Sequence, residues 1–293
     1  MIFGIVGNYN KENIFDIVSS LVEKLETRDL EYYICNSLER APKPFRNKNL
    51  ADIKTVAEKS DVLLSIGGDG TMLSTAFTAH QYEKPVVGIN IGKLGFLAEV
   101  DVQKTDLFLS NVLSGKYTIE ERMVLSAKCG IVEENEFVAF NDIVVDKGNW
   151  PKMIEITIKV DDESVATYSA DGIIIATPTG STGYSLSVGG PIVSPKSNVI
   201  TLSPISPHTL TVRPLVIPNT QKISVFVESA NTKVQVNCDG QRVREFKSPL
   251  ELEIIKDAKP LKILHTSLAS YFEILRTKLL WGLDVRKNNK ERE

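Results

Sequence analysis

The segment Asp61-Val-Leu-Leu-Ser-Ile-Gly-Gly-Asp-Gly-Thr71 decides the fold of the first part of the chain. Residues 62–66 form a mostly apolar run, which is typical of a strand buried on both faces. The glycines that follow allow the backbone to turn sharply. A helix is expected to begin near Thr71, whose hydroxyl can cap it, because apolar residues then recur on one side. These residues are Met72, Leu73, Ala76 and Phe77.

The same alternation of strands and helices extends over the first hundred residues. Apolar runs at residues 2–6, 32–35 and 85–89 indicate three more buried strands. Apolar side chains recur at helical spacing from Ile14 to Leu25 and predict an amphipathic helix. Buried strands that alternate with helices imply a mainly parallel sheet that is covered on both faces. The first part is therefore predicted to be an α/β domain.

The middle of the chain has a different pattern. In residues 154–160 and 234–238 apolar side chains alternate with polar ones, which is typical of a strand with one buried face. Further strand candidates are residues 223–227, 250–254 and 261–264. We therefore predict an antiparallel, β-rich domain from about residue 120 to residue 266.

The chain becomes helical again near its end. Ser270 and Glu273 have the spacing of a capping box, and Gly282 is expected to follow the helix end. One apolar face is predicted for this helix. It consists of Leu268, Phe272, Leu275 and Leu279.

The composition of the 293-residue chain limits its class. This length exceeds the usual size of a single core and favours two domains. The net charge of −3 does not favour a nucleic-acid-binding protein. Cys35, Cys129 and Cys238 form no C-x-x-C pair and are expected to be reduced and buried, and the three histidines show no zinc-site spacing. Neither a signal peptide nor a membrane-spanning apolar run is visible, so we expect a cytoplasmic protein without membrane contact.

The loop at residues 67–71 is suited to a phosphate group. Successive backbone N–H groups at the start of a helix attract an anion. Asp69 repels a phosphate unless it has another task, and two tasks fit. Its carboxylate could take up the proton of an attacking hydroxyl, or it could hold a Mg²⁺ ion that bridges phosphates. A tight turn in which Asp69 only bonds local backbone is the structural alternative, and it stays open at this point.

Two common nucleotide-binding loops are not supported. Gly88-Ile-Asn-Ile-Gly-Lys-Leu94 has three residues, not four, before its Gly-Lys pair and ends in leucine, so it is not a P-loop. No G-x-G-x-x-G follows the first strand, which argues against a dehydrogenase of the usual type.

A second glycine-rich segment extends from Ala170 to Pro191. Its apolar residues 173–176 predict a strand that ends in a turn rich in hydroxyl groups. These hydroxyls belong to Thr177, Thr179, Ser181 and Thr182. Hydroxyls can bond phosphates, ribose or base edges without adding charge, and Tyr184 offers a flat face for a base. A capped helix start with Tyr184 in the core is an equally weighted alternative.

A third polar site interrupts an apolar run at Asn141 and Asp142. An amide can both donate and accept, which suits an adenine edge. A carboxylate can accept two hydrogen bonds from a ribose diol. Taken alone, this pair is also compatible with a plain turn, and the turn is the favoured interpretation of the pair in isolation.

These segments, in this order, resemble the NAD kinase family. The matching stretches are residues 67–71, 88–96, 141–142, 171–191, 205–214 and 239–241. The resemblance covers nearly the whole chain, although the first motif alone is shared with diacylglycerol-type lipid kinases and is close to one in phosphofructokinases. It implies transfer of the γ-phosphoryl group of ATP, or of polyphosphate, to the 2′-hydroxyl of the adenosine ribose of NAD. It also implies Mg²⁺ with the donor and a homodimer or homotetramer.

The resemblance further implies a domain division and a set of site residues. An α/β domain would comprise residues 1–118 and 268–293, and a β-sandwich-like dinucleotide-binding domain residues 119–267. Asp69 resembles the proton acceptor of the family. The implied substrate contacts are Gly67, Gly68, Asp69, Gly70, Thr71, Phe96 beside the adenine, Asn141 on the adenine, Asp142 on the ribose, Lys152, Asp171 and Thr179 towards the nicotinamide, Thr182, Gly183, Tyr184, Ser185, Leu186, Ser187 and Gln241.

Departures from the family pattern are small, and two other functions remain as alternatives. Gly183 replaces an alanine found in many relatives, and Ser169 replaces an arginine found in some, which removes one cationic contact. A lipid or sugar kinase could use the same Gly67–Thr71 loop, but a lipid substrate would need an apolar groove instead of the hydroxyl-rich turn. A dinucleotide sensor without enzymatic activity would not need Asp69.

Overall fold

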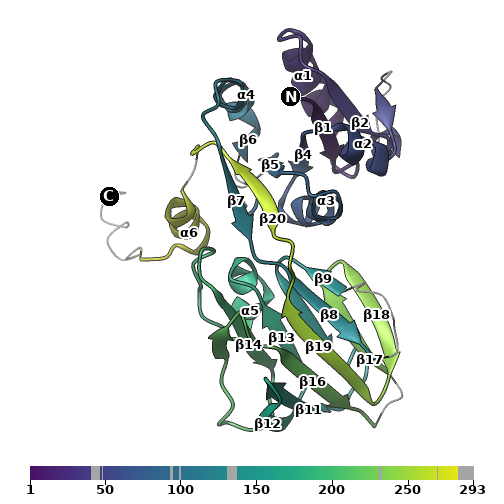
Figure 1. Ribbon diagram of the computed structural model, residues 1–293, viewed down its shortest axis with the longest axis vertical. Coiled ribbons are helices and arrows are strands. Elements are labelled where there is room, and N and C mark those ends of the chain that lie inside the picture. Colours follow the sequence, from purple (N-terminus) through teal and green to yellow (C-terminus); the bar gives the residue numbers. More distant parts are fainter. Residues whose placement is uncertain are drawn as a thin grey trace, which may run out of the picture. The chain divides into compact units, whose positions relative to one another are not determined.

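The computed structural model describes residues 1–40, 47, 49–92, 95–98, 100–130, 137–230, 233–268 and 270–282. Contacts between residues divide the chain into two compact units (Figure 1). The first consists of Met1–Glu120 together with the residues from Lys262 on, and the second of Glu121–Leu261. Residues 283–293 of the predicted α/β domain lie outside the described residues.

The first unit is built on a mainly parallel sheet. Its strands are β1 (Phe3–Gly7), β2 (Tyr32–Cys35), β3 (Leu50–Ala51), β4 (Val62–Gly67), β5 (Val86–Asn90), β6 (Val100–Asp101), β7 (Thr118–Arg122) and β20 (Leu261–His265). Their order is β3-β2-β1-β4-β5-β20-β7, and β6 pairs with β5. Every residue of β4 is buried, as expected for a strand covered on both faces.

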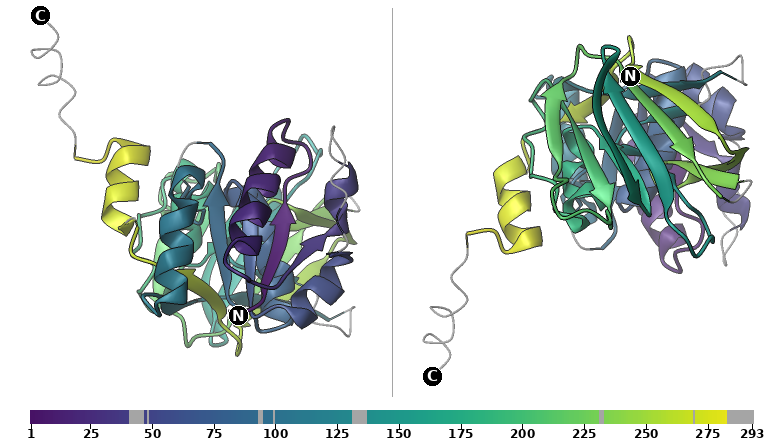
Figure 2. Two further views of the ribbon diagram at one scale, coloured as in Figure 1. Left: turned by 90° about the horizontal axis from the view of Figure 1, so that it is seen from above. Right: turned by 90° about the horizontal axis from the view of Figure 1, so that it is seen from below.

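Helices cover both faces of this sheet. They are α1 (Ile14–Glu26), α2 (Ile53–Lys59), α3 (Asp69–Gln81) and α4 (Thr105–Leu113), with 3₁₀ turns η1 (Asn36–Arg40) and η2 (Val102–Lys104). A further helix, α6 (Tyr271–Leu279), follows β20. Apolar side chains of α1 and α4 pack with Ile5, Leu64 and Ile89 in one core, and both helices lie on the same side of the sheet (Figure 2). On the opposite face α2 approaches so closely that a Cβ at Gly4 would lie 2.9 Å from Cγ1 of Val56.

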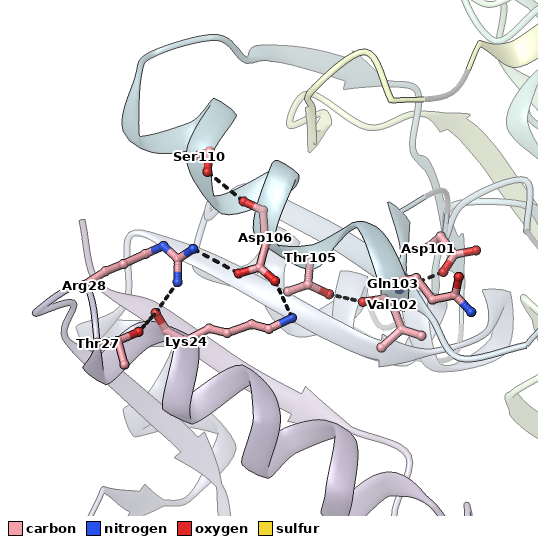
Figure 3. A network of polar contacts seen from close by, with 9 residues as sticks. All are labelled: Lys24, Thr27, Arg28, Asp101, Val102, Gln103, Thr105, Asp106 and Ser110. Atoms are coloured by element: carbon pink, nitrogen blue, oxygen red, sulfur yellow. Dashed lines mark hydrogen bonds and ion pairs between the residues drawn. The ribbon is translucent and has the colours of Figure 1, made fainter.

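An ion-pair network joins α1 to α4 (Figure 3). The carboxylate of Asp106, in the first turn of α4, accepts from Nζ of Lys24 at 2.8 Å and from Nη2 of Arg28 at 2.9 Å. Arg28 also donates to the carbonyl oxygen of Lys24. The carboxylate is exposed, so this network contributes to the relative orientation of the two helices more than to stability.

The second unit is a β-sandwich of two antiparallel sheets. One has the order β15-β14-β13-β10-β17-β18 and the other β12-β11-β16-β19-β8-β9. The strands are β8 (Leu125–Cys129), β9 (Phe137–Ala139), β10 (Asp142–Asp146), β11 (Ile154–Val160), β12 (Glu163–Ala170), β13 (Gly172–Ala176), β14 (Val199–Ile205), β15 (Leu215–Pro218), β16 (Ile223–Glu228), β17 (Lys233–Cys238), β18 (Arg242–Lys247) and β19 (Leu250–Lys256). Between β13 and β14 lie η3 (Thr179–Thr182) and the short helix α5 (Tyr184–Ser187).

The predicted period-two strands are confirmed. In β11 the apolar side chains are buried and alternate with exposed or half-buried polar ones, and β17 follows the same rule. The buried faces of both sheets form one core that includes Ile156, Ile175 and Val236. This is the packing expected for two sheets stacked face to face.

Two predictions are wrong, one about the sheet that a strand joins and one about the start of a helix. Residues 261–264 were expected in the antiparallel domain, but β20 pairs in parallel with β5, where Ile263 is opposite Val86. The helix after the glycine loop begins at Asp69 with Gly68 as its N-cap, so Thr71 lies inside the helix and does not cap it. A short strand such as β20, with three apolar residues among five, does not indicate which sheet it joins.

The predicted start of the last helix is confirmed, but its predicted apolar face is partly wrong. Oγ of Ser270 accepts from N–H of Glu273 at 3.2 Å, as the capping-box spacing predicts. The buried side chains of α6 are Ile274 and Leu275, whereas Phe272 is 60% exposed. The predicted apolar stripe was therefore partly wrong.

The structure also bears on the cysteines, on metal binding and on membrane-spanning helices. The three cysteines are free and buried, as predicted. Among the described residues, no group of three or more His, Cys, Asp or Glu side chains could hold a metal ion. No helix within the described ranges is long and apolar enough to cross a bilayer.

Candidate functional site

The glycine loop joins β4 directly to α3 in the first unit. A Cβ at Gly67 would lie 2.6 Å from Cβ of Thr71, so only glycine lets the Thr71 side chain fold back over the end of the strand. A Cβ at Gly68 would meet nothing within 4 Å, which leaves open space at the start of the helix. Backbone N–H groups at this position suit an anion.

The carboxylate of Asp69 holds a second loop, at residues 95–98. Oδ2 accepts from N–H of Phe96, and Oδ1 accepts from N–H of Leu97 and Ala98, each at 3.0 Å. A Cβ at Gly95 would overlap Oδ1 and lie 2.7 Å from Cγ of Asp69, so glycine is required there. Asp69 thus bonds backbone 27–29 residues away, and the alternative of a purely local turn is wrong.

This arrangement leaves one acceptor position on Asp69. A carboxylate oxygen has two lone pairs, and Oδ1 uses both of its own on Leu97 and Ala98. Oδ2 uses one on Phe96, and Asp69 is only half-buried. Oδ2 is therefore the atom that can accept a proton or a hydrogen bond from a substrate. The ring of Phe96 itself lies under Nζ of Lys278 from α6, 5.8 Å from the ring centroid.

In the second unit Asn141 and Asp142 stand at the start of β10, and their backbone is held from two sides. The carboxylate of Asp239 accepts from N–H of Phe140 at 2.9 Å, of Asn141 at 2.7 Å and of Asp142 at 3.3 Å. Arg242 donates to the same carboxylate at 2.8 Å. These bonds fix the three peptide groups that carry the predicted adenosine contacts.

The turn after β13 holds the other side of the same segment. Oγ1 of Thr177 donates to the carbonyl oxygen of Phe140 at 2.6 Å and accepts from N–H of Gly180 at 3.0 Å. N–H of Thr177 donates to the carbonyl oxygen of Asn141 at 2.9 Å. A Cβ at Gly180 would overlap that oxygen and lie 2.7 Å from Cα of Asn141.

Two buried polar atoms in this region have no hydrogen-bond partner in the described structure: Oδ1 of Asn141 and Oγ1 of Thr179. Buried polar groups are nearly always paired, so each unpaired one needs an explanation. A Cβ at Gly183 would lie 3.8 Å from both Nδ2 of Asn141 and Oδ2 of Asp142. Gly183 thus lies against an amide and a carboxyl group, and a bound polar molecule is one partner that would satisfy the unpaired atoms.

The electrostatic state of Asp142 is unusual. Burial, followed by the negative charge of Asp239, raises the pKa of Asp142 to about 7. Burial also raises the pKa of Asp239, whereas N–H of Asn141 and the guanidinium of Arg242 act in the opposite direction. Because Asp239 is surrounded by donors, it carries the charge of the pair, and Asp142 is the carboxyl group that titrates near neutrality.

The remaining predicted residues of η3 and α5 differ in what their side chains do. The ring of Tyr184 is 48% exposed, so the alternative in which it packs in the core is wrong. Oγ of Ser185 is buried and shares a 2.9 Å hydrogen bond with Ser203. Thr182 and Ser187 donate to backbone carbonyls three residues earlier. Leu186 is half-buried.

Three further predicted substrate contacts lie outside the segments described above: Lys152, Asp171 and Gln241. Asp171 forms an ion pair with Lys147 at 2.7 Å. Lys152 is exposed in the loop before β11, and Gln241 is exposed in the turn between β17 and β18. Asp69 belongs to one unit and Asn141 to the other. The predicted site residues are thus divided between the two units.

Asp239 and Arg242 were not assigned a role from the sequence. Asp239-Gly240 follows a period-two strand and opens the three-residue connection 239–241 to β18, and both residues have positive φ, +57° and +68°, as is common for Asp-Gly in a tight turn. The Asp-Gly pair could have predicted this turn. Nothing in the sequence near residue 239 indicates that its carboxylate bonds residues 140–142.

Two family models match the chain. The ATP-NAD kinase N-terminal domain matches residues 3–117, and the ATP-NAD kinase C-terminal domain matches residues 140–266. Among curated relatives, the NAD kinase of Chlorobium phaeobacteroides (strain BS1) is 43% identical over 285 residues, which cover 96% of this chain and 98% of that protein. The NAD kinase of Heliobacterium modesticaldum is 39% identical over 287 residues, which cover 95% and 98%.

Solved structures have the same fold. An NAD kinase from Archaeoglobus fulgidus in complex with ATP superimposes with a TM-score of 0.74 at 26% identity, covering 96% of this chain and 99% of that one. Yeast NADH kinase complexed with NADH has a TM-score of 0.87 at 22% identity, covering 98% and 89%, and supports the fold alone. The matches to both domain models and to relatives over nearly the full length show that this chain belongs to the NAD kinase family.

Proposed function

We propose that this chain transfers the γ-phosphoryl group of ATP to the 2′-hydroxyl of the adenosine ribose of NAD and so forms NADP. The observation that carries the proposal is the pair of unpaired buried atoms, Oδ1 of Asn141 and Oγ1 of Thr179, together with the buried carboxyl group of Asp142, which follows Asn141 in the chain. An amide, a hydroxyl and a carboxyl group are the kinds of group that would bind an adenosine.

The proposed chemistry assigns one task to each half of the site. Asn141 would bond the adenine edge, and Asp142 would accept hydrogen bonds from the ribose and direct the 2′-oxygen. The 2′-oxygen forms a bond to the γ-phosphorus while the bond from this phosphorus to the bridging oxygen breaks, and ADP leaves. Oδ2 of Asp69, which has a remaining lone pair, takes up the proton of the hydroxyl.

A divalent cation, Mg²⁺, is part of this proposal. It would neutralise charge on the donor phosphates. Because three backbone N–H groups already bond the Asp69 carboxylate, phosphate oxygens and water would supply most ligands of the ion. Polyphosphate as a second donor, a homodimer or homotetramer, and a cytoplasmic location complete the proposal. The donor and the oligomer rest on the family resemblance of the sequence, and the location is the expectation drawn from the sequence alone.

The assay that tests the function measures NADP formation from NAD with ATP, polyphosphate or no donor. A diacylglycerol and a sugar serve as competing acceptors. We expect NADP with ATP and Mg²⁺, and no product after chelation of the metal with EDTA until Mg²⁺ is restored. Tight NAD binding without any ATP-dependent product would instead identify a sensor, and phosphorylation of only the other acceptors would identify another kinase.

The KM for NAD is expected to depend on pH through Asp142. Since the pKa of Asp142 is about 7, its carboxyl group is largely protonated at pH 6 and accepts fewer hydrogen bonds from a ribose. If only the ionised form binds well, KM rises by about tenfold between pH 8 and pH 6. Steady-state kinetics of wild type and Asp142→Asn test this, because the variant should have a high KM that does not follow the same curve.

The same pKa predicts the sign of a stability effect. The folded pKa of Asp142 is raised above the unfolded value, so the folded state holds the proton more tightly. Its stabilising contribution is complete below about pH 4 and is lost as pH rises through 7. Denaturant unfolding should therefore show that wild type loses more stability than Asp142→Asn between pH 5 and pH 8. An equal loss in both proteins would contradict the assignment.

A further inference from the structure

The carboxylate of Asp239 is enclosed to a degree that excludes contact with a substrate. Its side chain is 0% exposed, whereas the guanidinium of its partner Arg242 belongs to a side chain that is 26% exposed. Asp69 also accepts from three consecutive backbone N–H groups, but it is half-buried and retains one acceptor position. The two aspartates use the same kind of bond, and only Asp69 can reach a reacting atom.

A buried carboxylate is costly unless its partners replace water. Here the partners are N–H groups of residues 140–142, which lie 97–99 positions earlier in the chain, and Arg242. Arg242 also donates to the carbonyl oxygen of Val138 at 2.7 Å, and N–H of Asp239 donates to the carbonyl oxygen of Asp142 at 3.0 Å. The region around the turn between β17 and β18 is thus tied both to the start of β10 and to β9.

The bonds leave little freedom to the two residues that face the proposed ligand. Asn141 and Asp142 receive these bonds only through their backbone, so their side chains stay available. Thr177 holds the carbonyl side of the same segment, because its Oγ1 donates to the carbonyl oxygen of Phe140 and its N–H to that of Asn141. A shift of the segment on the Asp239 side would move the Asn141 amide and the Asp142 carboxyl group together.

We propose that Asp239, held by Arg242, is a positioning residue that presents the side chains of Asn141 and Asp142 to the adenosine part of the dinucleotide. The proposal rests on the proposed function of the Asn141 site. Asp239 sets the affinity for the dinucleotide without touching it, and it takes no part in the proton transfer assigned to Asp69.

Two kinetic results distinguish positioning from a purely structural role. In Asp239→Asn an oxygen at the Oδ1 position can still accept from the N–H groups of residues 140–142, but the NH₂ group at the Oδ2 position faces Nη2 of Arg242, so the bond to Arg242 and the negative charge are lost. We expect the KM for NAD to rise by about tenfold to a hundredfold, the KM for ATP to stay within about twofold, and kcat to change far less than the KM for NAD. Loss of the Asp239 charge also lowers the pKa of Asp142, so the pH dependence of this KM moves to lower pH.

Variants of Arg242 provide an independent test of the positioning role if Asp239→Asn fails to fold. Arg242→Gln removes the cation beside Asp239 and should raise the KM for NAD, and Arg242→Lys should restore most of the affinity. Glu245→Gln is the matched control, because Glu245 lies on the same strand and its side chain forms an exposed ion pair with Lys233. It should leave every constant unchanged. Thermal unfolding and calorimetric NAD binding accompany the kinetics.

Different measurements test the proposed function and the positioning role of Asp239. NADP formation by the wild-type protein tests the function, and the ratio of each variant to wild type tests Asp239. Folded Asp239→Asn and Arg242→Gln proteins with NAD affinity within twofold of wild type would overturn the positioning role. So would an equal loss of affinity for NAD and ATP. A selective loss for NAD with partial recovery in Arg242→Lys supports it.

Discussion

Replacement of Asp69 by asparagine is expected to reduce kcat for NADP formation by about 10²–10⁴-fold and to leave NAD binding nearly unchanged. Oδ2 is the only carboxylate oxygen of Asp69 with a lone pair that the described backbone does not use. Asparagine can keep a carbonyl oxygen for Leu97 and Ala98, but the atom at the Oδ2 position becomes an NH₂ group that accepts no proton. Rapid-mix and steady-state assays of NADP formation measure the loss.

The control must separate lost chemistry from a loosened loop. An NH₂ group facing N–H of Phe96 removes one hydrogen bond, which costs about 1 kcal/mol in stability. Asp52→Asn is a matched variant, because Asp52 also accepts from two backbone N–H groups, those of Lys54 and Thr55, at the start of α2. It should lower the melting temperature without changing kcat. Near-normal turnover of folded Asp69→Asn would remove Asp69 from the proposed mechanism.

Substitution of Gly180 by alanine is expected to lower kcat/KM for NAD by about a hundredfold and to destabilise the second unit. The added Cβ would overlap the carbonyl oxygen of Asn141 and lie 2.7 Å from its Cα, so backbone has to move. A misplacement of about 1 Å costs on the order of 10²-fold in rate, and overpacking costs about 1–3 kcal/mol. Thermal unfolding, calorimetric NAD binding and steady-state kinetics measure the three effects.

Gly183→Ala is the control for this substitution. Its Cβ would lie 3.1 Å from the carbonyl oxygen of Gly180 and 3.8 Å from the side chains of Asn141 and Asp142, which a small adjustment can accommodate. We expect kcat/KM within about threefold of wild type, as a substitution without a steric clash should show. Equal defects in the two variants would show that bulk anywhere in this turn is harmful and would contradict the specific contact at Asn141.

The arrangement of each unit into strands and helices was largely predictable from local patterns. The order of apolar and polar residues shows how many faces of a strand are covered. β4 is apolar throughout most of its length and is buried on both faces, whereas β11 alternates and is buried on one. The start of α6 was predictable for a similar reason, because the Ser270 hydroxyl and N–H of Glu273 are only three residues apart. The face of α6 was not, since burial of Ile274 instead of Phe272 depends on what packs against the helix.

The sequence by itself determined the fold class, the family and the polar residues around Asn141, because periodicity and motif spacing are properties of neighbouring residues. The tertiary structure decided which loop each aspartate holds: Asp69 bonds residues 96–98, and Asp239 bonds residues 140–142. The physical reason is that the donors in both cases are backbone N–H groups. Every residue except proline has one, so the partner of such a carboxylate leaves no signature in the sequence.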